Sequence, residues 1–311
     1  MTLVAGSLEE LPDTAVRSDA DGPGPLARFR SPGGLAVDAA GNVYVADTMN
    51  HTIRKIWTDN MVTRFAGAVR VPGNVDGFVA TFSFPAGIGF DGAGNLYVTD
   101  GWSAQALSGN VWWTCVRKVS PAAEVGTVLV IKAPDVILGP SIVVDAAGGF
   151  WFTYGGAVRR IDQAGASTNV TVPERSRAIA SLAVDKSGTV YIGDQNTISK
   201  VVPGQPEVVL AGTGTVGYAD GAGSQARFDF YQPGVLNMSA LMTSMVVDSA
   251  GTLYVADTNN RVIRRITPAG VVSTVSTLPF AFASPPRGLA LAGDKTLFVT
   301  SANAVLRIDL A

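Results

Sequence analysis

The feature that most constrains this chain is a short segment that occurs six times. Residues 34–47 contain the run Val-Asp-Ala-Ala-Gly-Asn-Val-Tyr-Val-Ala-Asp, and residues 87–100 and 244–257 repeat it closely. Weaker copies cover 141–154 and 181–194, and a last copy at 287–301 has lost both aspartates. The first aspartate of each copy, replaced by alanine at 292 in the last, recurs at Asp38, Asp91, Asp145, Asp185 and Asp248. Intervals of 40 to 63 residues are the size of a propeller blade.

Each copy predicts two short antiparallel strands joined by a tight turn. The glycine of Asp-x-x-Gly supplies the left-handed conformation that the turn needs, and the aspartate caps it. A third apolar run follows at 52–56, 116–119, 157–161, 197–201, 262–266 and 305–308, and a fourth is clearest at 61–66, 207–211 and 271–275. Four strands per unit and six units predict an all-β, six-bladed β-propeller. A charged fraction of 15% and 35 glycines agree with many turns and few polar helices.

One domain is predicted over 1–311. The expected blades cover about 32–67, 85–132, 139–172, 179–212, 242–277 and 285–310. The last blade has only three strands, whereas residues 2–6 resemble the fourth strands of earlier blades. We therefore expect residues 2–6 to complete the last blade, because closure of the ring leaves no open sheet edge at the seam.

Residues 37–54 and 247–264 share the pattern Val-Asp-x-x-Gly-x-x-Tyr-Val-Ala-Asp-Thr-x-Asn-His/Arg-x-Ile-Arg. This pattern resembles the NHL-repeat family, and the resemblance extends over nearly the whole chain. It implies a six-bladed propeller. The family includes protein and RNA scaffolds, extracellular sensor domains and an amidating lyase, with lactonase-like and strictosidine-synthase-like enzymes as more distant relatives. The resemblance thus implies one fold and several activities.

Extra residues gather in the loops after the second and fourth strands, which meet at one face of a propeller. We call this face the insertion face. Three of its loops begin with Asp-Gly and end with phenylalanine, at 21–29, 76–82 and 220–228. In one interpretation Phe29, Phe82 and Phe228 pack between blades. In the other, Arg28 and Arg227 face a ligand.

Aspartates end the second strand in four repeats, at Asp47, Asp100, Asp194 and Asp257. Arranged around the axis, they would form a ring of carboxylates that can bind a ligand or, where burial raises a pKa, act in acid–base chemistry. Alternatively, each accepts hydrogen bonds from nearby backbone, as aspartate does in turns. Tyr154 and Ser301 interrupt the ring in two repeats, which favours the structural alternative.

The main insertion within a repeat lies at 101–115, between the second and third strands of the second repeat. It contains Trp102, Trp112 and Trp113, three of the five tryptophans. We expect a long loop that either covers its own blade or serves as a recognition surface, because indole rings offer a large contact area at low entropic cost.

Metal and cofactor chemistry is constrained by one histidine, His51, and one cysteine, Cys115. They exclude zinc or copper centres built from several nitrogen and sulfur ligands. No cofactor is expected, although oxygen ligands leave calcium or magnesium open. The amidating lyase of the family needs several zinc-binding histidines. Lactonase-like relatives hold calcium at the tops of the inner strands with Glu, Asn and Asp, where this chain has glycine or serine.

A glutamate serves as acid or base in the strictosidine-synthase-like relatives. Of the five glutamates here, only Glu174 lies near an expected inner strand, beside Arg175 and Arg177. Glu174 is the best candidate for a catalytic residue, and pairing with these arginines is its structural alternative.

Charge argues against nucleic acid as a partner. The net charge is −2, and the arginines of the insertion-face loops are accompanied by aspartates in the same loops, so local charge nearly cancels. The sequence contains no run of about 18 apolar residues, so it predicts no membrane-spanning helix. Met1 directly precedes the first strand, as it would if a leader had been removed, which favours a secreted or periplasmic location over a cytoplasmic one.

The sequence therefore predicts a propeller that binds a small molecule or a protein at its insertion face. The alternative is an enzyme, such as a lyase, cyclase or hydrolase, with an acidic residue at the mouth of the central channel. The Asp-x-x-Gly turns of the opposite face are expected to make no contact with this ligand. Contacts are expected from Trp102, Trp112, Trp113, Arg28, Arg175, Arg177, Arg227, Asp47, Asp100, Asp194 and Asp257.

Overall fold

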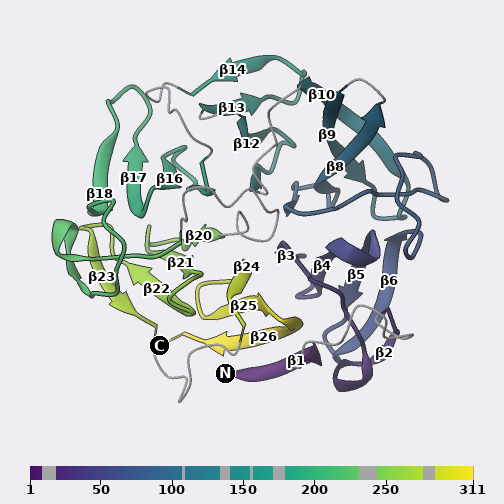
Figure 1. The fold of residues 1–311 in the computed structure, drawn as a ribbon, viewed down its shortest axis with the longest axis horizontal. Helices are drawn as coiled ribbons and strands as arrows, with labels where there is room; N and C mark the ends of the chain where they lie inside the picture. The colour runs from purple at the N-terminus through teal and green to yellow at the C-terminus, as the bar shows by residue number, and fades with distance from the viewer. Residues whose placement is uncertain are drawn as a thin grey trace.

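The protein is a β-propeller in which six antiparallel sheets surround a central axis in the described part of the chain (Figure 1). This confirms the fold that the repeats predict. The computed structural model describes residues 1–8, 19–106, 109–133, 141–154, 157–170, 179–230, 244–275 and 284–310, with the backbone alone at 102–106, 109–114, 132–133 and 154.

The first three blades follow in chain order around the axis. Blade 1 contains β2 (Gly22–Pro23), β3 (Leu35–Val37), β4 (Val43–Asp47), β5 (Thr52–Ile56) and β6 (Met61–Gly67). Blade 2 contains β7 (Ile88–Phe90), β8 (Leu96–Ala106), β9 (Gly109–Val119) and β10 (Val125–Ala133). Blade 3 contains β11 (Ile142–Val144), β12 (Phe150–Tyr154), β13 (Ala157–Ile161) and β14 (Ser167–Asn169).

The remaining blades complete the ring. Blade 4 contains β15 (Ser181–Val184), β16 (Val190–Asp194), β17 (Thr197–Val201) and β18 (Val208–Gly212). Blade 5 contains β19 (Gly221–Ala222), β20 (Met245–Val247), β21 (Leu253–Asp257), β22 (Val262–Ile266) and β23 (Val271–Thr274). Blade 6 contains β24 (Pro286–Ala292), β25 (Thr296–Ser301), β26 (Asn303–Asp309) and β1 (Thr2–Ser7).

The N-terminal strand closes the ring, as predicted. β1 pairs antiparallel with β26, from Thr2 opposite Arg307 to Ser7 opposite Asn303. Figure 1 shows β1 along the outer side of β26, next to blade 1. The last blade thereby gains its fourth strand, and the two ends of the chain share one sheet.

Blades 1 and 5 contain a fifth strand that the four-strand pattern did not predict. The two-residue strands β2 and β19 come from the Asp-Gly loops and pair with the outer strands β6 and β23. In blade 2 the corresponding Gly77 forms a single bridge with Val125. In blades 1 and 5 a short 3₁₀ helix follows, η1 (Gly24–Leu26) or η3 (Gly223–Gln225).

The Asp-x-x-Gly turns have the expected geometry. In blade 1, Asp38 Oδ1 accepts hydrogen bonds from the backbone N–H groups of Ala40 and Asn42, at 3.0 and 2.8 Å. Gly41 has φ +87°, a conformation that a side chain disfavours. The same capping pattern recurs at Asp91, Asp145, Asp185 and Asp248.

The core consists of interfaces between neighbouring blades. Buried apolar side chains of the described residues form six clusters, each joining two adjacent sheets. Strands such as β4 and β21 are buried along their whole length, because both faces of an inner blade sheet contact a neighbour. In the described residues no helix has the length and apolar character needed to cross a membrane.

The tryptophan-rich insertion of blade 2 is a hairpin, where the sequence predicted a long loop. β8 and β9 each run for eleven residues and stay in register from Leu96 opposite Val119 to Ala106 opposite Gly109. β10 pairs with the same extension as far as Ala133 opposite Trp112. A sheet extension of three strands therefore rises from blade 2 on the insertion face.

Candidate functional site

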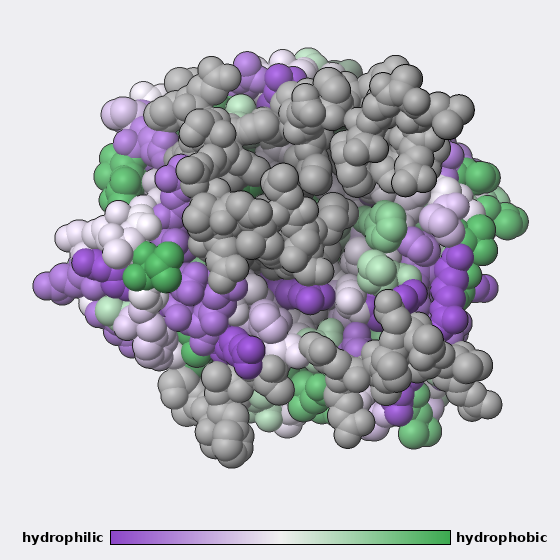
Figure 2. All heavy atoms as spheres, in the orientation of Figure 1, coloured by the Kyte–Doolittle hydropathy of each residue, from purple (hydrophilic) through white to green (hydrophobic). Residues whose placement is uncertain are grey.

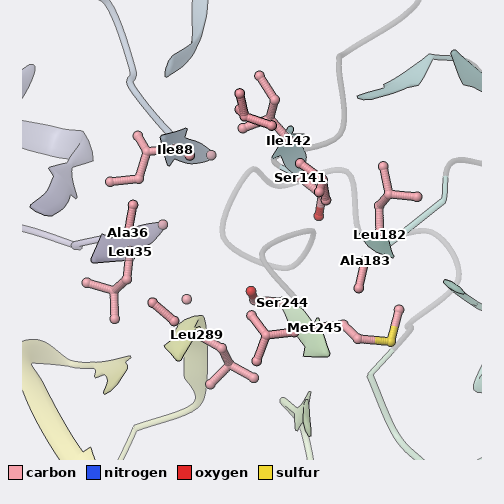
Figure 3. A pocket seen from close by; sticks show the side chains of 18 of the residues that line it. Leu35, Ala36, Ile88, Ser141, Ile142, Leu182, Ala183, Ser244, Met245 and Leu289 are labelled. Atoms are coloured by element: carbon pink, nitrogen blue, oxygen red, sulfur yellow. The ribbon is translucent and has the colours of Figure 1, made fainter. Parts of the chain in front are cut away.

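The inner strands of all six blades enclose a central channel. The cavity has a volume of about 340 Å³ and is lined by β3, β7, β11, β15, β20 and β24. Most residues that line it are apolar, but the larger side chains among them are directed away from the channel into the blade interfaces (Figure 3), as for Leu35, Ile88, Ile142, Leu182 and Leu289. The wall therefore offers both polar and apolar surface to a ligand.

Polar groups enter the channel where the inner strands begin. Ser141 and Ser244 lie at this end, and Figure 3 shows their hydroxyl oxygens directed toward the channel. Arg287 also lines the cavity, directly before Gly288. These residues lie at the insertion-face end, since the opposite end of each inner strand leads into an Asp-x-x-Gly turn.

On the insertion-face side of blade 1, a buried arginine joins the strand-end aspartate to the preceding Asp-Gly loop. Arg54 is 1% exposed and donates through Nη1 to Asp47 Oδ2 at 3.1 Å. Its Nη2 donates to Asp21 Oδ1 at 2.6 Å. The same guanidinium donates to the backbone oxygens of Arg28 and Ala20. We call such an arginine with its two aspartates a clasp.

The two aspartates of this clasp also bind backbone and amide groups. Asp47 Oδ1 accepts from the Arg30 N–H at 2.7 Å, and Asp47 Oδ2 accepts from Asn50 Nδ2 at 2.9 Å. Asp21 Oδ2 accepts from the Arg64 N–H at 3.2 Å. The clasp therefore connects the inter-blade loop, the second strand and the outer strand β6.

Blade 2 repeats the arrangement. Arg117 is fully buried and donates to Asp100 Oδ2 at 3.3 Å and to Asp76 Oδ1 at 2.6 Å. Asp100 Oδ1 accepts from the N–H groups of Ser83 and Phe84 at 2.8 and 3.0 Å.

Blade 5 repeats it again. Arg264 donates to Asp257 Oδ2 and to Asp220 Oδ1, both at 2.8 Å. Asp257 also accepts from Asn260 Nδ2 at 2.9 Å and from the Asp229 N–H at 2.8 Å. Each clasp thus holds one insertion-face loop by two charge-assisted contacts and several backbone bonds.

Burial shifts the titration of the clasp aspartates. Burial raises the pKa of Asp47 to about 6, although Arg54 and the hydrogen bonds to Asp47 act to lower it. Burial likewise raises the pKa of Asp100 to about 6 and raises that of Asp257. For Asp76, hydrogen bonds from Thr127 and Arg117 outweigh the effect of burial and hold the pKa below its ordinary value.

The fourth predicted aspartate has a different neighbour. Asp194 is buried, at 5% exposure, and its blade has Ser199 at the position of the clasp arginine, because Ser199 pairs with Ile192 as Arg54 pairs with Val45. None of the four strand-end aspartates is among the described residues that line the channel. Their part in ligand binding stays a prediction.

The phenylalanines of the Asp-Gly loops pack between blades, as one interpretation predicted. All three are fully buried, and each ring lies 5.1–5.4 Å from the guanidinium carbon of its clasp arginine. They belong to the interfaces of blades 6 and 1, 1 and 2, and 4 and 5, as Phe29, Phe82 and Phe228 respectively.

The two loop arginines make local bonds. Arg28 Nη1 donates to the backbone oxygens of Pro25 and Ala27, both at 2.8 Å. Arg227 Nη1 does the same with Ser224 and Ala226, at 2.6 and 2.8 Å. Both side chains are half-buried at the insertion face, so their predicted contact with a ligand would involve the remaining guanidinium nitrogens.

The other predicted site residues are defined by backbone position or lie outside the described residues. Trp102 pairs with Trp113, and Trp112 pairs with Ser103 and Ala133. All three tryptophans therefore lie in the sheet extension above blade 2. Glu174, Arg175 and Arg177 lie outside the described residues.

The single histidine is buried. His51 is 8% exposed and has φ +59°. Its ring lies edge-on to Phe84 with the centroids 4.8 Å apart, and burial lowers its pKa. Among the described residues, no group of His, Cys, Asp and Glu side chains has the arrangement of a metal site.

The site residues predicted from the sequence did not include Arg54, Arg117 and Arg264. A signal was present: blades 1 and 5 have an arginine seven residues after the strand-end aspartate, and both are preceded by an Asp-Gly loop. In blade 2 the hairpin lengthens this spacing to seventeen residues, which conceals the correspondence.

The described part of the insertion face is mixed in character. Figure 2 shows hydrophilic residues over much of it, and hydrophobic residues mainly toward the rim of the disc. The rim includes partly exposed valines of outer strands, among them Val128, Val130, Val208, Val209 and Val271.

Comparison with known proteins supports the fold. Residues 29–56 match the model of the NHL repeat. No curated protein matches the sequence. An auxiliary nutrient binding protein from Bacteroides thetaiotaomicron has a TM-score of 0.68 at 16% identity, over 98% of this chain and 76% of that chain.

Two enzymes share the fold at similarly low sequence identity. A gluconolactonase from Xanthomonas campestris has a TM-score of 0.60 at 13% identity, over 91% of this chain and 87% of its own. The virginiamycin B lyase from Staphylococcus aureus has a TM-score of 0.52 at 15% identity, over 90% of this chain and 84% of that chain. At these identities the likeness concerns the fold. The chain is a six-bladed β-propeller with an NHL repeat at residues 29–56.

Proposed function

We propose that this protein is a binding propeller that recognises a small molecule over the insertion-face end of the central channel. The observation that carries the proposal is the commitment of Asp47, Asp100 and Asp257 to clasps. Each of these carboxylates accepts hydrogen bonds from a buried arginine and from backbone N–H groups. These carboxylates position loops, and they are buried at 0–1% exposure and absent from the described channel lining, so a ligand in the channel does not reach them.

The rest of the site has the character of a binding surface. The channel offers both polar and apolar surface, with the Ser141 and Ser244 hydroxyls at its insertion-face end. The extension of blade 2 carries three tryptophans above the same face. A ligand that combines an apolar part with several hydrogen-bonding groups fits this combination. That a nutrient binding protein shares the fold supports a binding role without deciding the ligand.

Removal of two tryptophans tests the location of the site. Trp112→Ala with Trp113→Ala should abolish the ligand-induced rise in melting temperature and leave the ligand-free melting temperature nearly unchanged, because the hairpin lies outside the blade core. Trp57→Ala is the matched control, since Trp57 is 43% exposed in the turn between β5 and β6 on the opposite face. Unfolding of the double variant would place these tryptophans in the core and refute the assignment.

An enzyme remains the second candidate because a lyase and a gluconolactonase share the fold. Its acid or base would be Glu174, with Arg175 and Arg177 beside it in sequence. Mass spectrometry of the ligand after prolonged incubation separates the two functions. Recovery of unchanged ligand supports the binding protein, whereas a product that is lost in Glu174→Gln supports the enzyme.

A further inference from the structure

The face opposite the insertions, which we call the turn face, carries one feature in all six blades. An aromatic residue of the second strand pairs across the sheet with a lysine or arginine of the third. The pairs are Tyr44 with Lys55, Tyr97 with Lys118, Trp151 with Arg160, Tyr191 with Lys200, Tyr254 with Arg265 and Phe298 with Arg307. The side chains that surround this pair differ from one blade interface to the next.

Between blades 1 and 2 the space around this pair is filled by aromatic rings. Tyr44 makes edge-to-face contacts with Phe65 and Phe90, with ring centroids 5.0 and 4.9 Å apart. Phe65 occupies a bulge in β6, and Phe90 ends the inner strand of the next blade. Such contacts close the turn-face end of this interface.

Between blades 2 and 3 the equivalent side chains are smaller. Val128 lies in the bulge of β10 that corresponds to the Phe65 bulge, and Val144 ends β11 as Phe90 ends β7. Phe150 approaches Tyr97 with a centroid distance of 5.7 Å. A cavity of about 420 Å³ nevertheless opens here, lined on its apolar side by Tyr97, Val128, Leu129, Phe150 and Ile161.

The polar side of this cavity mixes donors and acceptors. Lys118, whose side chain is 41% exposed, lies 4.0 Å from Asp91, so these two charges largely offset each other. Asp162 uses Oδ1 to accept the Ala166 N–H at 2.8 Å, and Gln163 is exposed beside it. The remaining carboxylate gives the lining a net negative charge, which disfavours anions.

We propose that this cavity binds a small, neutral, polyhydroxylated molecule of mono- or disaccharide size. A hydroxyl group both donates and accepts, so one ligand can satisfy the ammonium of Lys118, the carboxylate of Asp162 and the amide of Gln163 together. The C–H surface of such a molecule packs against Val128 and Leu129. The volume falls within the range of small-molecule sites.

The test combines a panel of ligands with a substitution that fills the cavity. Glucose, maltose and sorbitol are compared with butylamine and citrate by ligand-observed NMR and calorimetry. Val128→Phe introduces the aromatic ring that blade 1 has at the equivalent position, Phe65. Because the ring fills the cavity, it should weaken polyol binding at least about tenfold. The control is Val130→Phe, because Val130 is 54% exposed on the same strand and does not line the cavity.

Three outcomes decide the proposal. Millimolar or tighter binding of a polyol that Val128→Phe weakens and Val130→Phe preserves supports it. Absence of polyol binding at millimolar concentration overturns it, as does a stronger response to butylamine or citrate, or unchanged binding in Val128→Phe. If Val128→Phe lowers the melting temperature, Asp162→Asn replaces it, because this change keeps one oxygen for the Ala166 N–H and removes the second acceptor. Binding there must then fall several-fold.

This site does not depend on the insertion-face proposal. Trp112→Ala with Trp113→Ala should leave polyol binding unchanged, since the two sites lie at opposite ends of the blades. Loss of polyol binding in that double variant would instead assign the polyol to the insertion face and overturn the turn-face site.

Discussion

Blades 1, 2 and 5 differ from blade 4 at one position of the third strand. All four blades bury the aspartate that ends the second strand, at 0–5% exposure. Three of them add a buried arginine, whereas blade 4 has Ser199 there. Among these four blades, the arginine is found where the preceding loop begins with Asp-Gly. Blade 3, whose second strand ends at Tyr154, has the half-buried Arg159 at the equivalent position without such a loop. A buried strand-end aspartate therefore does not by itself require the arginine, and the full clasp forms where the Asp-Gly loop supplies the second carboxylate.

The physical reason lies in the two ends of the guanidinium. One nitrogen contacts the buried aspartate and the other contacts an aspartate that is about half exposed, such as Asp220 at 50%. A planar fork with several donors suits this bridging role. The clasp thereby attaches a surface loop to the blade core.

The largest effect is expected from removal of a clasp arginine. Arg264→Met leaves the Asp257 carboxylate buried without its counter-ion and should lower the free energy of unfolding by about 3–5 kcal/mol. Arg160→Met is the control, because Arg160 and Asp145 have side chains 35% and 25% exposed, and it should cost about 1 kcal/mol or less. Urea denaturation measures both. Equal losses would show that the clasp has no special role.

A smaller effect is expected at the exposed end of the clasp. Asp220→Ala removes the bonds from Arg264 and from Thr274 and should cost about 1.5–3 kcal/mol. Asp309→Ala is the matched control, since Asp309 is 68% exposed and pairs with the half-exposed Arg307. Hydrogen exchange should rise in the 219–228 loop of the first variant alone. An unaltered loop in Asp220→Ala would contradict the attachment role.

The pH dependence of stability gives a third comparison. Asp47 and Asp100 have folded pKa values of about 6, above the ordinary aspartate value. At pH values between the ordinary aspartate pKa and about 6, the folded state binds more protons than the unfolded state. The contribution of Asp47 and Asp100 therefore makes the unfolding free energy rise as pH falls from about 6 toward 4. The slope is at most about 1.4 kcal/mol per pH unit for each group.

The contribution of Asp76 to the pH dependence of stability has the opposite sign, because its pKa in the folded state is lowered. Its contribution is present above the ordinary pKa and is lost as pH falls below it. Asp100→Asn should flatten the stability profile between pH 4 and 6, measured by urea denaturation at each pH. A profile identical to that of the unchanged protein would mean that Asp100 does not titrate there.

The smallest effect concerns the turn between the second and third strands. Ala302 has φ +52° at the position of His51 and Arg261, which are also left-handed. Ala302→Gly should raise the unfolding free energy by about 0.5–1 kcal/mol, because glycine removes the steric penalty of this conformation. Ala304→Gly, in strand β26, should lower it by a similar amount. Melting temperatures that move in the same direction would refute this.

Local features could be predicted from the sequence by itself. The hairpin turns depend on residues within four positions of one another, so five Asp-x-x-Gly turns and the degenerate sixth copy define six hairpins and the blade count. The missing strand of the last copy and its likeness to residues 2–6 also predicted the closure by β1. One of the two interpretations of the Asp-Gly loops placed their phenylalanines between blades, because loops pack their own side chains.

Contacts between distant residues were decided only by the tertiary structure. Arg54 reaches Asp21, which lies 33 residues earlier, and no local pattern contains that distance. The extension of blade 2 is a sheet because β10 pairs with β9, a partnership that the composition of a tryptophan-rich segment does not indicate. The turn-face cavity depends on the size of one side chain. Val128 of blade 2 faces blade 3, whereas the larger Phe65 takes the equivalent place in blade 1 and faces blade 2. Side-chain volume leaves a space only when two blades are placed face to face, so the sequence determined the blades and the packing between them determined the sites.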